Sequence, residues 1–367
     1  MKATRQLHDL GQSLWLDNIT RTLLDDGTLA RYINEDSITG LTSNPSIFDK
    51  AIGDGDAYDA GIHAKALAGL SGEKLFTELA LEDLRRAADL FAPVYQRTGG
   101  VDGWVSMEVS PLLAADTAGS IAAARQIHAA GKRDNLFVKI PGTPEGVGAI
   151  EESIFLGIPI NVTLLFSCAQ YEASAEAYLR GIERRIEAGL DPRVRSVASL
   201  FVSRWDVAAN EQLPQAMHNQ LGIAVARQAY RAYRQLLASP RWMKLAAAGA
   251  QPQRLLWAST GTKDPNASDT LYISTLAAPN TINTMPEKTL HAFAEHGQLD
   301  GVMPLDGGDA DAVVGKIGQA GVDVDALAEK LQRDGAEAFV KSWKQLLQRI
   351  ADKAAALGDK GQGPAMS

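Results

Sequence analysis

Short apolar runs alternate with longer helix-like stretches along most of the chain. Each run has the length and composition of a buried strand, and each is followed by at least one stretch that could form a helix. Eight such β-then-α units without an internal break favour the α/β class, as a closed parallel (β/α)8 TIM barrel rather than a doubly wound sheet. The expected strands are Ser13–Asp17, Ile38–Thr42, Gly103–Glu108, Leu136–Ile140, Pro159–Thr163, Ser196–Val202, Arg254–Ala258 and Thr281–Thr284.

Helix boundaries are marked most clearly around two of the expected helices. Thr143 followed by Pro144 is typical of an N-cap and first helical residue, and Gly157 is a typical end. Ser167 with Gln170 predicts a capping box that opens the next helix.

Two segments depart from a minimal barrel. The Gly- and Asp-rich stretch Asp49–Gly72 predicts an insertion made of loop and short helix. After Gly301 we expect a C-terminal helical extension, in which Ala336–Ala356 is strongly amphipathic. We therefore expect one barrel domain over residues 1–357 and a disordered tail over 358–367.

Composition and charge narrow the classes of function. Apolar residues make up 46% of the chain, as in ordinary globular proteins. A net charge of −8 without a basic cluster argues against nucleic acid as a partner, although a basic site for small anions remains compatible with it. The single cysteine, Cys168, fits a reducing cytoplasm, and we expect neither a signal peptide nor a membrane span.

Polar residues occur at or just after the carboxyl ends of the expected strands. Since parallel barrels carry their chemistry at that face, these side chains should converge there. They are Asp17, Asn44, Glu108, Lys139, Asn161, Thr163, Arg204 and Ser259.

Lys139 is the central candidate, because it stands alone in the apolar strand Leu136–Ile140. Strand alternation puts it on the same face as Phe137. If that face lies inside the barrel, burial favours the neutral amine, which can attack a ketone and form an imine. The alternative is a lysine whose tip reaches solvent at the strand end.

Two carboxylates accompany Lys139. Glu108 is the one charge in its strand, and it could relay protons through a water during imine formation, or simply form a structural ion pair. Asp17 follows Leu14-Trp15-Leu16, and its alternative role is to cap the next helix.

Amide and hydroxyl side chains complete the expected pocket. Asn161 and Thr163 point to one face of their strand, which favours a polar interior. Asn44 precedes Pro45, so it could equally belong to an ordinary turn.

Arg204 and Lys263 are the candidate phosphate ligands. Arginine suits bidentate recognition of phosphate, and lysine acts as a point charge. Ser259 and the amides that follow it could complete a cradle. Without further context, a solvated loop charge is the favoured interpretation of Lys263.

The order of these motifs resembles the transaldolases, in their longer bacterial form. The similarity spans about residues 4 to 350, and its most specific stretches are Thr42-Ser43-Asn44-Pro45-Ser46 and Asn161-Val162-Thr163-Leu164-Leu165-Phe166-Ser167, with Val138-Lys139-Ile140-Pro141 between them.

The resemblance implies roles for the candidate residues. Lys139 would form a Schiff base with C2 of fructose 6-phosphate or sedoheptulose 7-phosphate, in the pentose phosphate pathway. Glu108 would relay protons through a water held by Thr163, and Asp17 would take the C4 hydroxyl proton as the C3–C4 bond breaks. The acceptor would be glyceraldehyde 3-phosphate or erythrose 4-phosphate. The substrate-binding residues would be Asn44, Asn161, Ser199, Arg204, Ser259 and Lys263.

The resemblance also implies no metal and no other cofactor, because the iminium serves as the electron sink. His291 and His296 are five apart and do not share a helical face, so they are not expected to form a metal pair. Many transaldolases have an arginine two residues after the serine that matches Ser259, whereas this chain has Gly261. We hypothesise that Lys263 replaces that charge.

Two other functions remain open at this point. An aldolase of the same superfamily would split fructose 6-phosphate, but those chains are much shorter and usually carry glutamine where this chain has Glu108. A non-catalytic barrel is disfavoured by the combined presence of Lys139, Glu108 and Asp17. The oligomeric state, monomer or homodimer, is left undetermined.

Overall fold

The computed structural model describes residues 1–299 and 301–361 and confirms the predicted barrel. Its strands form an 8-stranded parallel sheet in the order β2-β1-β8-β7-β6-β5-β4-β3. The sheet closes between β2 and β3 by a single bridge from Gly40 to Trp104. There the Leu41 amide donates to the Trp104 carbonyl at 2.9 Å, and the Gly103 amide donates to the Thr39 carbonyl at 2.8 Å.

All eight strands occur where the sequence predicts them, with ends displaced by no more than two residues. The strands are β1 (Ser13–Asp17), β2 (Ile38–Thr42), β3 (Val105–Glu108), β4 (Leu136–Pro141), β5 (Ile160–Leu165), β6 (Ser196–Phe201), β7 (Gln253–Ala258) and β8 (Ile282–Met285).

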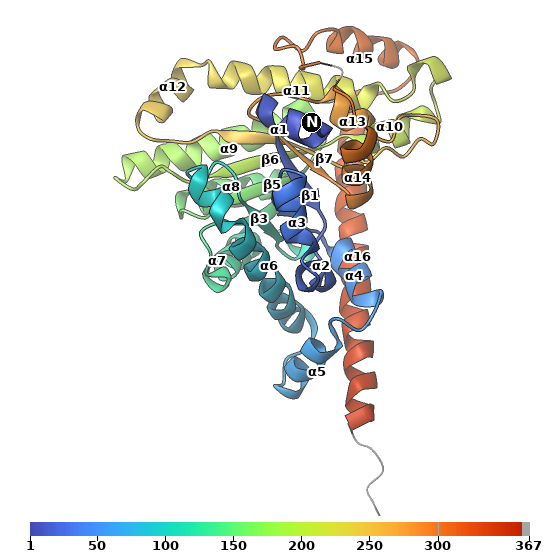
Figure 1. The fold of residues 1–367 in the computed structure, drawn as a ribbon. Coiled ribbons are helices and arrows are strands. Elements are labelled where there is room, and N and C mark those ends of the chain that lie inside the picture. Colours follow the sequence, from blue (N-terminus) through green and yellow to red (C-terminus); the bar gives the residue numbers. More distant parts are fainter. Residues whose placement is uncertain (300, 362–367) are drawn as a thin grey trace, which may run out of the picture.

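Helices surround the barrel and connect its strands (Figure 1). The helices are α1 (Ala3–Leu10), α2 (Arg21–Asp25), α3 (Thr28–Glu35), α4 (Pro45–Gly53), α5 (Asp59–Leu67), α6 (Gly72–Arg97), α7 (Thr117–Gly131), α8 (Pro144–Phe155), α9 (Cys168–Glu187), α10 (Ser203–Asn210), α11 (Leu221–Leu237), α12 (Pro240–Ala247), α13 (Leu271–Thr275), α14 (Glu287–His296), α15 (Ala310–Gln319) and α16 (Val324–Gly361).

The predicted caps of α8 and α9 are confirmed. The Thr143 side chain accepts from the Gly146 amide at the start of α8. At α9, the Ser167 hydroxyl accepts from the Gln170 amide, and the Gln170 side chain accepts from the Ser167 amide in return. Each cap satisfies amides that the first helical turn leaves free, which fixes where these helices leave the barrel.

An aromatic layer fills the barrel below the polar strand ends. The rings of Trp104 and Phe137 stack with centroids 4.0 Å apart, and Trp15 lies against Phe137 at 6.3 Å. Gly40 makes room for them, because a Cβ there would lie 2.6 Å from the Trp15 ring. Strand alternation then places Asp17 and Lys139 one inward position above Trp15 and Phe137.

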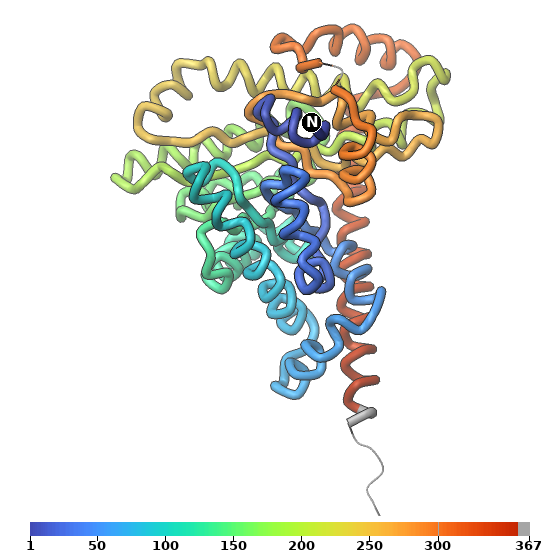
Figure 2. Tube along the Cα trace, in the orientation of Figure 1, coloured from blue at the N-terminus to red at the C-terminus, as the bar shows by residue number. Residues whose placement is uncertain are grey.

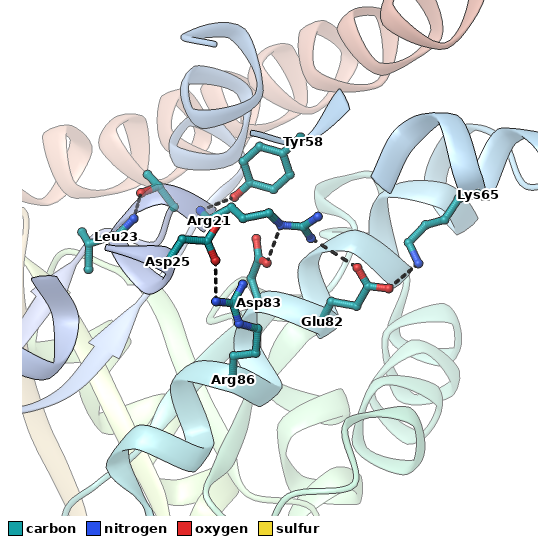
Figure 3. Close-up of polar contacts among 9 residues, drawn as sticks. Arg21, Leu23, Asp25, Tyr58, Lys65, Glu82, Asp83 and Arg86 are labelled. Carbon is teal, nitrogen blue, oxygen red and sulfur yellow. Dashed lines mark hydrogen bonds and ion pairs between the residues drawn. The ribbon is translucent and has the colours of Figure 1, made fainter. Parts of the chain in front are cut away.

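A buried charged cluster fixes the chain just after β1 (Figure 3). Arg21, the first residue of α2, donates to Asp83 of α6 at 3.0 Å, and its backbone amide donates to the Tyr58 hydroxyl at 3.0 Å. Asp83 is fully buried; burial raises its pKa, and the Arg21 charge opposes that rise. The cluster ties α2 and α5 to α6, and so holds the segment that follows Asp17.

The C-terminal extension is a single long helix. α16 runs down one side of the molecule alongside α4 and α5 (Figures 1 and 2), and it also contacts α6 and β5. Its buried stripe includes Phe339, Trp343, Leu346 and Ile350, as the amphipathic pattern predicts.

The two segments expected outside a minimal barrel contain helices that pack on each other. The stretch Asp49–Gly72 holds the end of α4, the short helix α5 and the loops around it, as predicted. Both helices are stabilised by packing on α16, a partner distant in sequence. α16 extends to Gly361, four residues into the predicted tail, and the remainder of that tail at 362–367 lies outside the described residues.

Within residues 1–299 and 301–361, none of the helices combines the length and the apolar character required to cross a bilayer.

Candidate active site

A pocket of about 140 Å³ opens at the carboxyl ends of the strands. It brings together every predicted site residue except Glu108 and Asn161, which lie directly behind its wall. The predicted residues that line it are Asp17, Asn44, Lys139, Thr163, Ser199, Arg204, Ser259 and Lys263. They come from four strands and from the loops and helices that follow strands, so only the closed barrel gathers them.

Lys139 lies inside the barrel and is 5% exposed, so the alternative of a solvent-reaching lysine is wrong. Its Nζ donates to the Ser43 carbonyl at 2.9 Å and lies 3.2 Å from Oε2 of Glu108. The β3–β4 register pairs Glu108 directly with Lys139, and the β4–β5 register pairs Lys139 with Asn161. An amine on a packed strand with two fixed neighbours has little freedom to turn away from the pocket.

Glu108 is buried beside Lys139. Burial raises the pKa of Glu108, the positive charge of Lys139 opposes the rise, and the charge of Asp17 adds to it. The expected ion pair therefore exists, but its partner is the candidate nucleophile itself. Among the described residues, neither oxygen of Glu108 has a well-aligned hydrogen-bond donor, and Oγ1 of Thr163 is equally unpartnered although fully buried. Both groups are therefore available to hydrogen-bond a water or a substrate hydroxyl.

Asp17 faces the pocket from the end of β1 and is partly exposed to it. The Thr42 hydroxyl donates to its Oδ1 at 2.7 Å. Burial raises the pKa of Asp17, whereas Lys139, the Thr42 hydrogen bond, Arg204 and Lys263 favour the charged form. The helix-capping alternative is wrong, because Thr20 caps α2.

The two asparagines differ in their access to the pocket. Asn44 caps α4, with Oδ1 accepting from the Ile47 amide at 3.1 Å, and it also lines the pocket. Asn161 is fully buried: its Oδ1 accepts from Ser199 at 2.7 Å and its Nδ2 donates to Ser106 at 3.1 Å. Ser199 is thus the group through which Asn161 is connected to the pocket surface.

Arg204 lines the pocket between aromatic neighbours. Its guanidinium carbon lies 5.1 Å from the ring centre of Phe201 and 5.8 Å from that of Phe339. Burial lowers its pKa, and the carboxylates of Asp17 and Glu108 oppose that effect. No carboxylate in residues 1–299 or 301–361 lies within ion-pair distance of it, so its donors are free for a ligand.

Ser259 and Lys263 line the same end of the pocket. Ser259 has a left-handed backbone, with φ 54°, and its hydroxyl lies 2.8 Å from that of Ser203. The Lys263 side chain is exposed, and over the described parts of the chain it forms no ion pair. The position of Lys263 at the pocket wall is compatible with the phosphate-ligand role and with the solvated-charge alternative.

Several pocket residues were not singled out from the sequence. Phe339 comes from α16, and sequence alone marked it only as part of an apolar helix face. The Thr42 hydroxyl bridges Asp17 and Thr284, at 2.7 Å from each. The Ser43 carbonyl, which accepts from Lys139, is a backbone group, so the side-chain pattern of the sequence gives no indication of its role.

A wider cleft of about 770 Å³ lies next to the pocket and shares Lys263 with it. Amide and carboxylate side chains dominate its wall, and it lacks a lysine–carboxylate pair such as that of Lys139 and Glu108. In the part of the chain that is described, no three His, Cys, Asp or Glu side chains come together as metal ligands. His291 instead lies 2.7 Å from the Tyr32 hydroxyl, and His296 lies 2.9 Å from Asp269.

Comparison with known proteins gives consistent results. A family model described as Transaldolase/Fructose-6-phosphate aldolase matches residues 14–350. A transaldolase of Thermobifida fusca is 45% identical over 361 residues, which cover 96% of this chain and 98% of the relative. Transaldolases of Arthrobacter sp. and Thiobacillus denitrificans are 45% and 43% identical, covering 94% and 95% of this chain and 95% and 100% of their own lengths.

Proposed function

Because the chain belongs to the Transaldolase/Fructose-6-phosphate aldolase family, we propose that its pocket transfers a dihydroxyacetone unit between sugar phosphates through a Schiff base on Lys139. The full-length relatives carry the name transaldolase, which favours transfer over simple aldol cleavage. The observation that carries the mechanism is the buried amine of Lys139, 3.2 Å from Glu108 at the barrel mouth.

The first stage is imine formation. The neutral amine of Lys139 attacks C2 of a ketose phosphate, either fructose 6-phosphate or sedoheptulose 7-phosphate, and gives a carbinolamine. Loss of its hydroxyl as water requires a proton. Glu108, whose pKa is raised by burial, can supply that proton through a water held between it and the unpartnered hydroxyl of Thr163.

The second stage is carbon–carbon cleavage. Asp17 takes the C4 hydroxyl proton, the C3–C4 bond breaks, and an aldose phosphate leaves. The electron pair moves into the iminium, so C3 is held as an enamine. The iminium is a fixed positive charge at the position of Lys139, and the field of Lys139 already favours the charged form of Asp17. The base is therefore most available once the imine has formed.

The third stage reverses this chemistry with an acceptor. The enamine attacks the aldehyde of erythrose 4-phosphate or glyceraldehyde 3-phosphate, Asp17 returns a proton to the new hydroxyl, and water hydrolyses the imine. No carbon is oxidised or reduced overall. Asn44 and Ser199, with Asn161 behind Ser199, would hold the hydroxyls of the three-carbon unit.

The phosphate end is assigned to Arg204, Ser259 and Lys263. Arg204 offers free guanidinium donors between two aromatic rings, and Lys263 supplies a second positive charge in place of an arginine at Gly261. We further propose that the enzyme acts in the cytoplasm, as a monomer or a homodimer, in the pentose phosphate pathway.

Trapping with borohydride tests this function. The protein is incubated with fructose 6-phosphate and borohydride, and the adduct is mapped by mass spectrometry. A reduced adduct on Lys139, absent from Lys139→Met and retained by Lys288→Met, supports the Schiff base. Formation of sedoheptulose 7-phosphate after addition of erythrose 4-phosphate distinguishes transfer from cleavage. A label on any other lysine would refute the assignment.

A further inference from the structure

One residue of β5 has a backbone conformation that leucine rarely adopts. Leu164 has φ 57°, in the left-handed region, and it directly follows Thr163. The pairing with β6 slips at the same place, from Val162 with Ala198 to Leu165 with Leu200. The pairing therefore advances by three residues along β5 and by only two along β6. This irregularity is a β-bulge, and a β-bulge changes the direction of the neighbouring side chains.

The bulge is held by the C-terminal helix. Gln332 of α16 is 9% exposed, and its Nε2 donates to the carbonyl of Leu164 at 3.0 Å and to that of Gly142 at 2.9 Å. The Gly142 amide in turn donates to the Thr163 carbonyl at 2.7 Å. One side-chain amide therefore connects the end of β4, which carries Lys139, to the strained turn of β5, which carries Thr163.

Two other residues of the same helical face also reach the site. A Cβ on Gly335 would lie 3.0 Å from the Leu164 side chain and 3.1 Å from the Arg204 guanidinium, so the helix packs tightly against both side chains at this point. Phe339, one turn further, lines the pocket and lies over Arg204. Spacings of three and four residues place Gln332, Gly335 and Phe339 in one row.

We propose that Gln332 is a positioning residue for the Schiff-base chemistry, a role that rests on the proposed function. Its amide holds the bulge that aims the Thr163 hydroxyl into the pocket, and so sets the geometry of the water that carries protons during imine formation. Without the two hydrogen bonds, two buried carbonyls lose their donors, and Leu164 relaxes toward an ordinary strand conformation. Thr163 then turns away from the path of the proton.

The primary test replaces Gln332 by methionine, which has similar length and no donor. Proton relay depends on position, so we expect the kcat of transfer and the rate of imine trapping to fall together by about tenfold or more. KM for fructose 6-phosphate should stay within about twofold, because Arg204 and Lys263 are untouched.

Two control variants on α16 separate positioning from anchoring. Gln345→Met changes an exposed glutamine and should leave kcat unchanged. Leu346→Ala removes a fully buried anchor away from the pocket, so it should lower Tm without lowering kcat at 25 °C. A kcat for Gln332→Met within about twofold of wild type, or an equal loss in Leu346→Ala, would overturn the proposal.

Gln332→Glu adds a measurement, the pH dependence of kcat, that would not change if Gln332 only anchored α16 to the barrel. A protonated carboxyl can still donate one hydrogen bond to a carbonyl, whereas a carboxylate repels both. The ratio of variant to wild-type kcat should therefore fall as the pH rises from about 5 to about 8. A flat ratio contradicts the positioning role. This comparison does not involve Gln332→Met, so it serves even if that variant does not fold.

Failure of the function and failure of this inference are distinguishable. If wild-type protein gives no trapped imine on Lys139, the proposed function itself is wrong. If wild type is trapped normally and Gln332→Met is trapped equally fast, only the role of Gln332 is refuted.

Discussion

The amine nitrogen of Lys139 lies 3.2 Å from Oε2 of Glu108, and both side chains are buried at the barrel mouth. Because both side chains are largely withdrawn from bulk solvent, proton exchange between them and a bound substrate takes place inside the pocket. The closeness of the pair follows from the β3–β4 register, in which the two residues are direct neighbours.

Replacing Glu108 by glutamine keeps the shape of the side chain and removes its ability to exchange a proton. We expect kcat for transfer to fall by about 100-fold or more, the usual range for loss of a general acid–base group. KM for fructose 6-phosphate should change little. Steady-state kinetics measure both, with the exposed Glu145→Gln as the control. Wild-type kcat in Glu108→Gln would exclude Glu108 from proton transfer.

Asp17→Asn should lower activity and raise stability. Burial raises the pKa of Asp17 in the folded state, so the native protein holds this proton more tightly than the unfolded chain. The associated stability is complete below the ordinary value of 3.8 and is lost as the pH rises through the folded pKa. As the pH rises above 3.8 the wild type therefore loses this stability to the cost of the buried charge, which asparagine avoids.

Thermal unfolding at several pH values tests whether Asp17→Asn raises stability at neutral pH, as expected. The Tm of Asp17→Asn should exceed that of wild type at pH 7, and the difference should narrow as the pH falls toward 3.8. An Asn variant less stable than wild type at pH 7 would show that the neighbouring positive charges outweigh the cost of burial.

If Lys263 and Arg204 bind the substrate phosphate, removing either side chain should raise KM without slowing imine formation. Lys263→Ala should raise KM for phosphorylated donors by about tenfold, the value of one charge-assisted contact, while imine trapping at saturating donor stays near wild type. Arg204→Met should raise KM further, because it removes several donors. An unchanged KM in Lys263→Ala would remove Lys263 from the site and leave it as a solvated loop charge.

The cluster in Figure 3 predicts a stability effect at a distance from the pocket. Asp83→Ala leaves Arg21 without its buried partner, and Arg21 is only 14% exposed, so we expect a loss of about 3 kcal/mol. Asp25→Ala breaks the Asp25–Arg86 pair, whose side chains are 56% and 44% exposed, and should cost at most about 1 kcal/mol. Urea unfolding measures both. Equal losses would contradict the assignment of Asp83 as the buried anchor.

The site could be predicted from sequence as far as its residues lie on or next to strands. Asp17, Lys139 and Thr163 stand in alternating, otherwise apolar strands, and the barrel brings strand ends to one face whatever the details of packing. The same reasoning could not identify Phe339, because the local sequence of an amphipathic helix does not determine which strand end the helix will cover. Gln332 was missed for the same reason: it lies 168 residues from the Leu164 carbonyl that it holds.

The sequence by itself determined the β-then-α alternation, the eight strands, the helix caps at Thr143 and Ser167, and the set of polar residues at the barrel mouth, because these depend on local periodicity and hydrogen bonding. Only the tertiary structure decided which polar groups are left without partners, how α4 and α5 fold against α16, and how that helix reaches the bulge in β5. Those features depend on contacts between segments far apart in the chain. Such contacts contribute to stability only after the barrel has closed and brought the segments together.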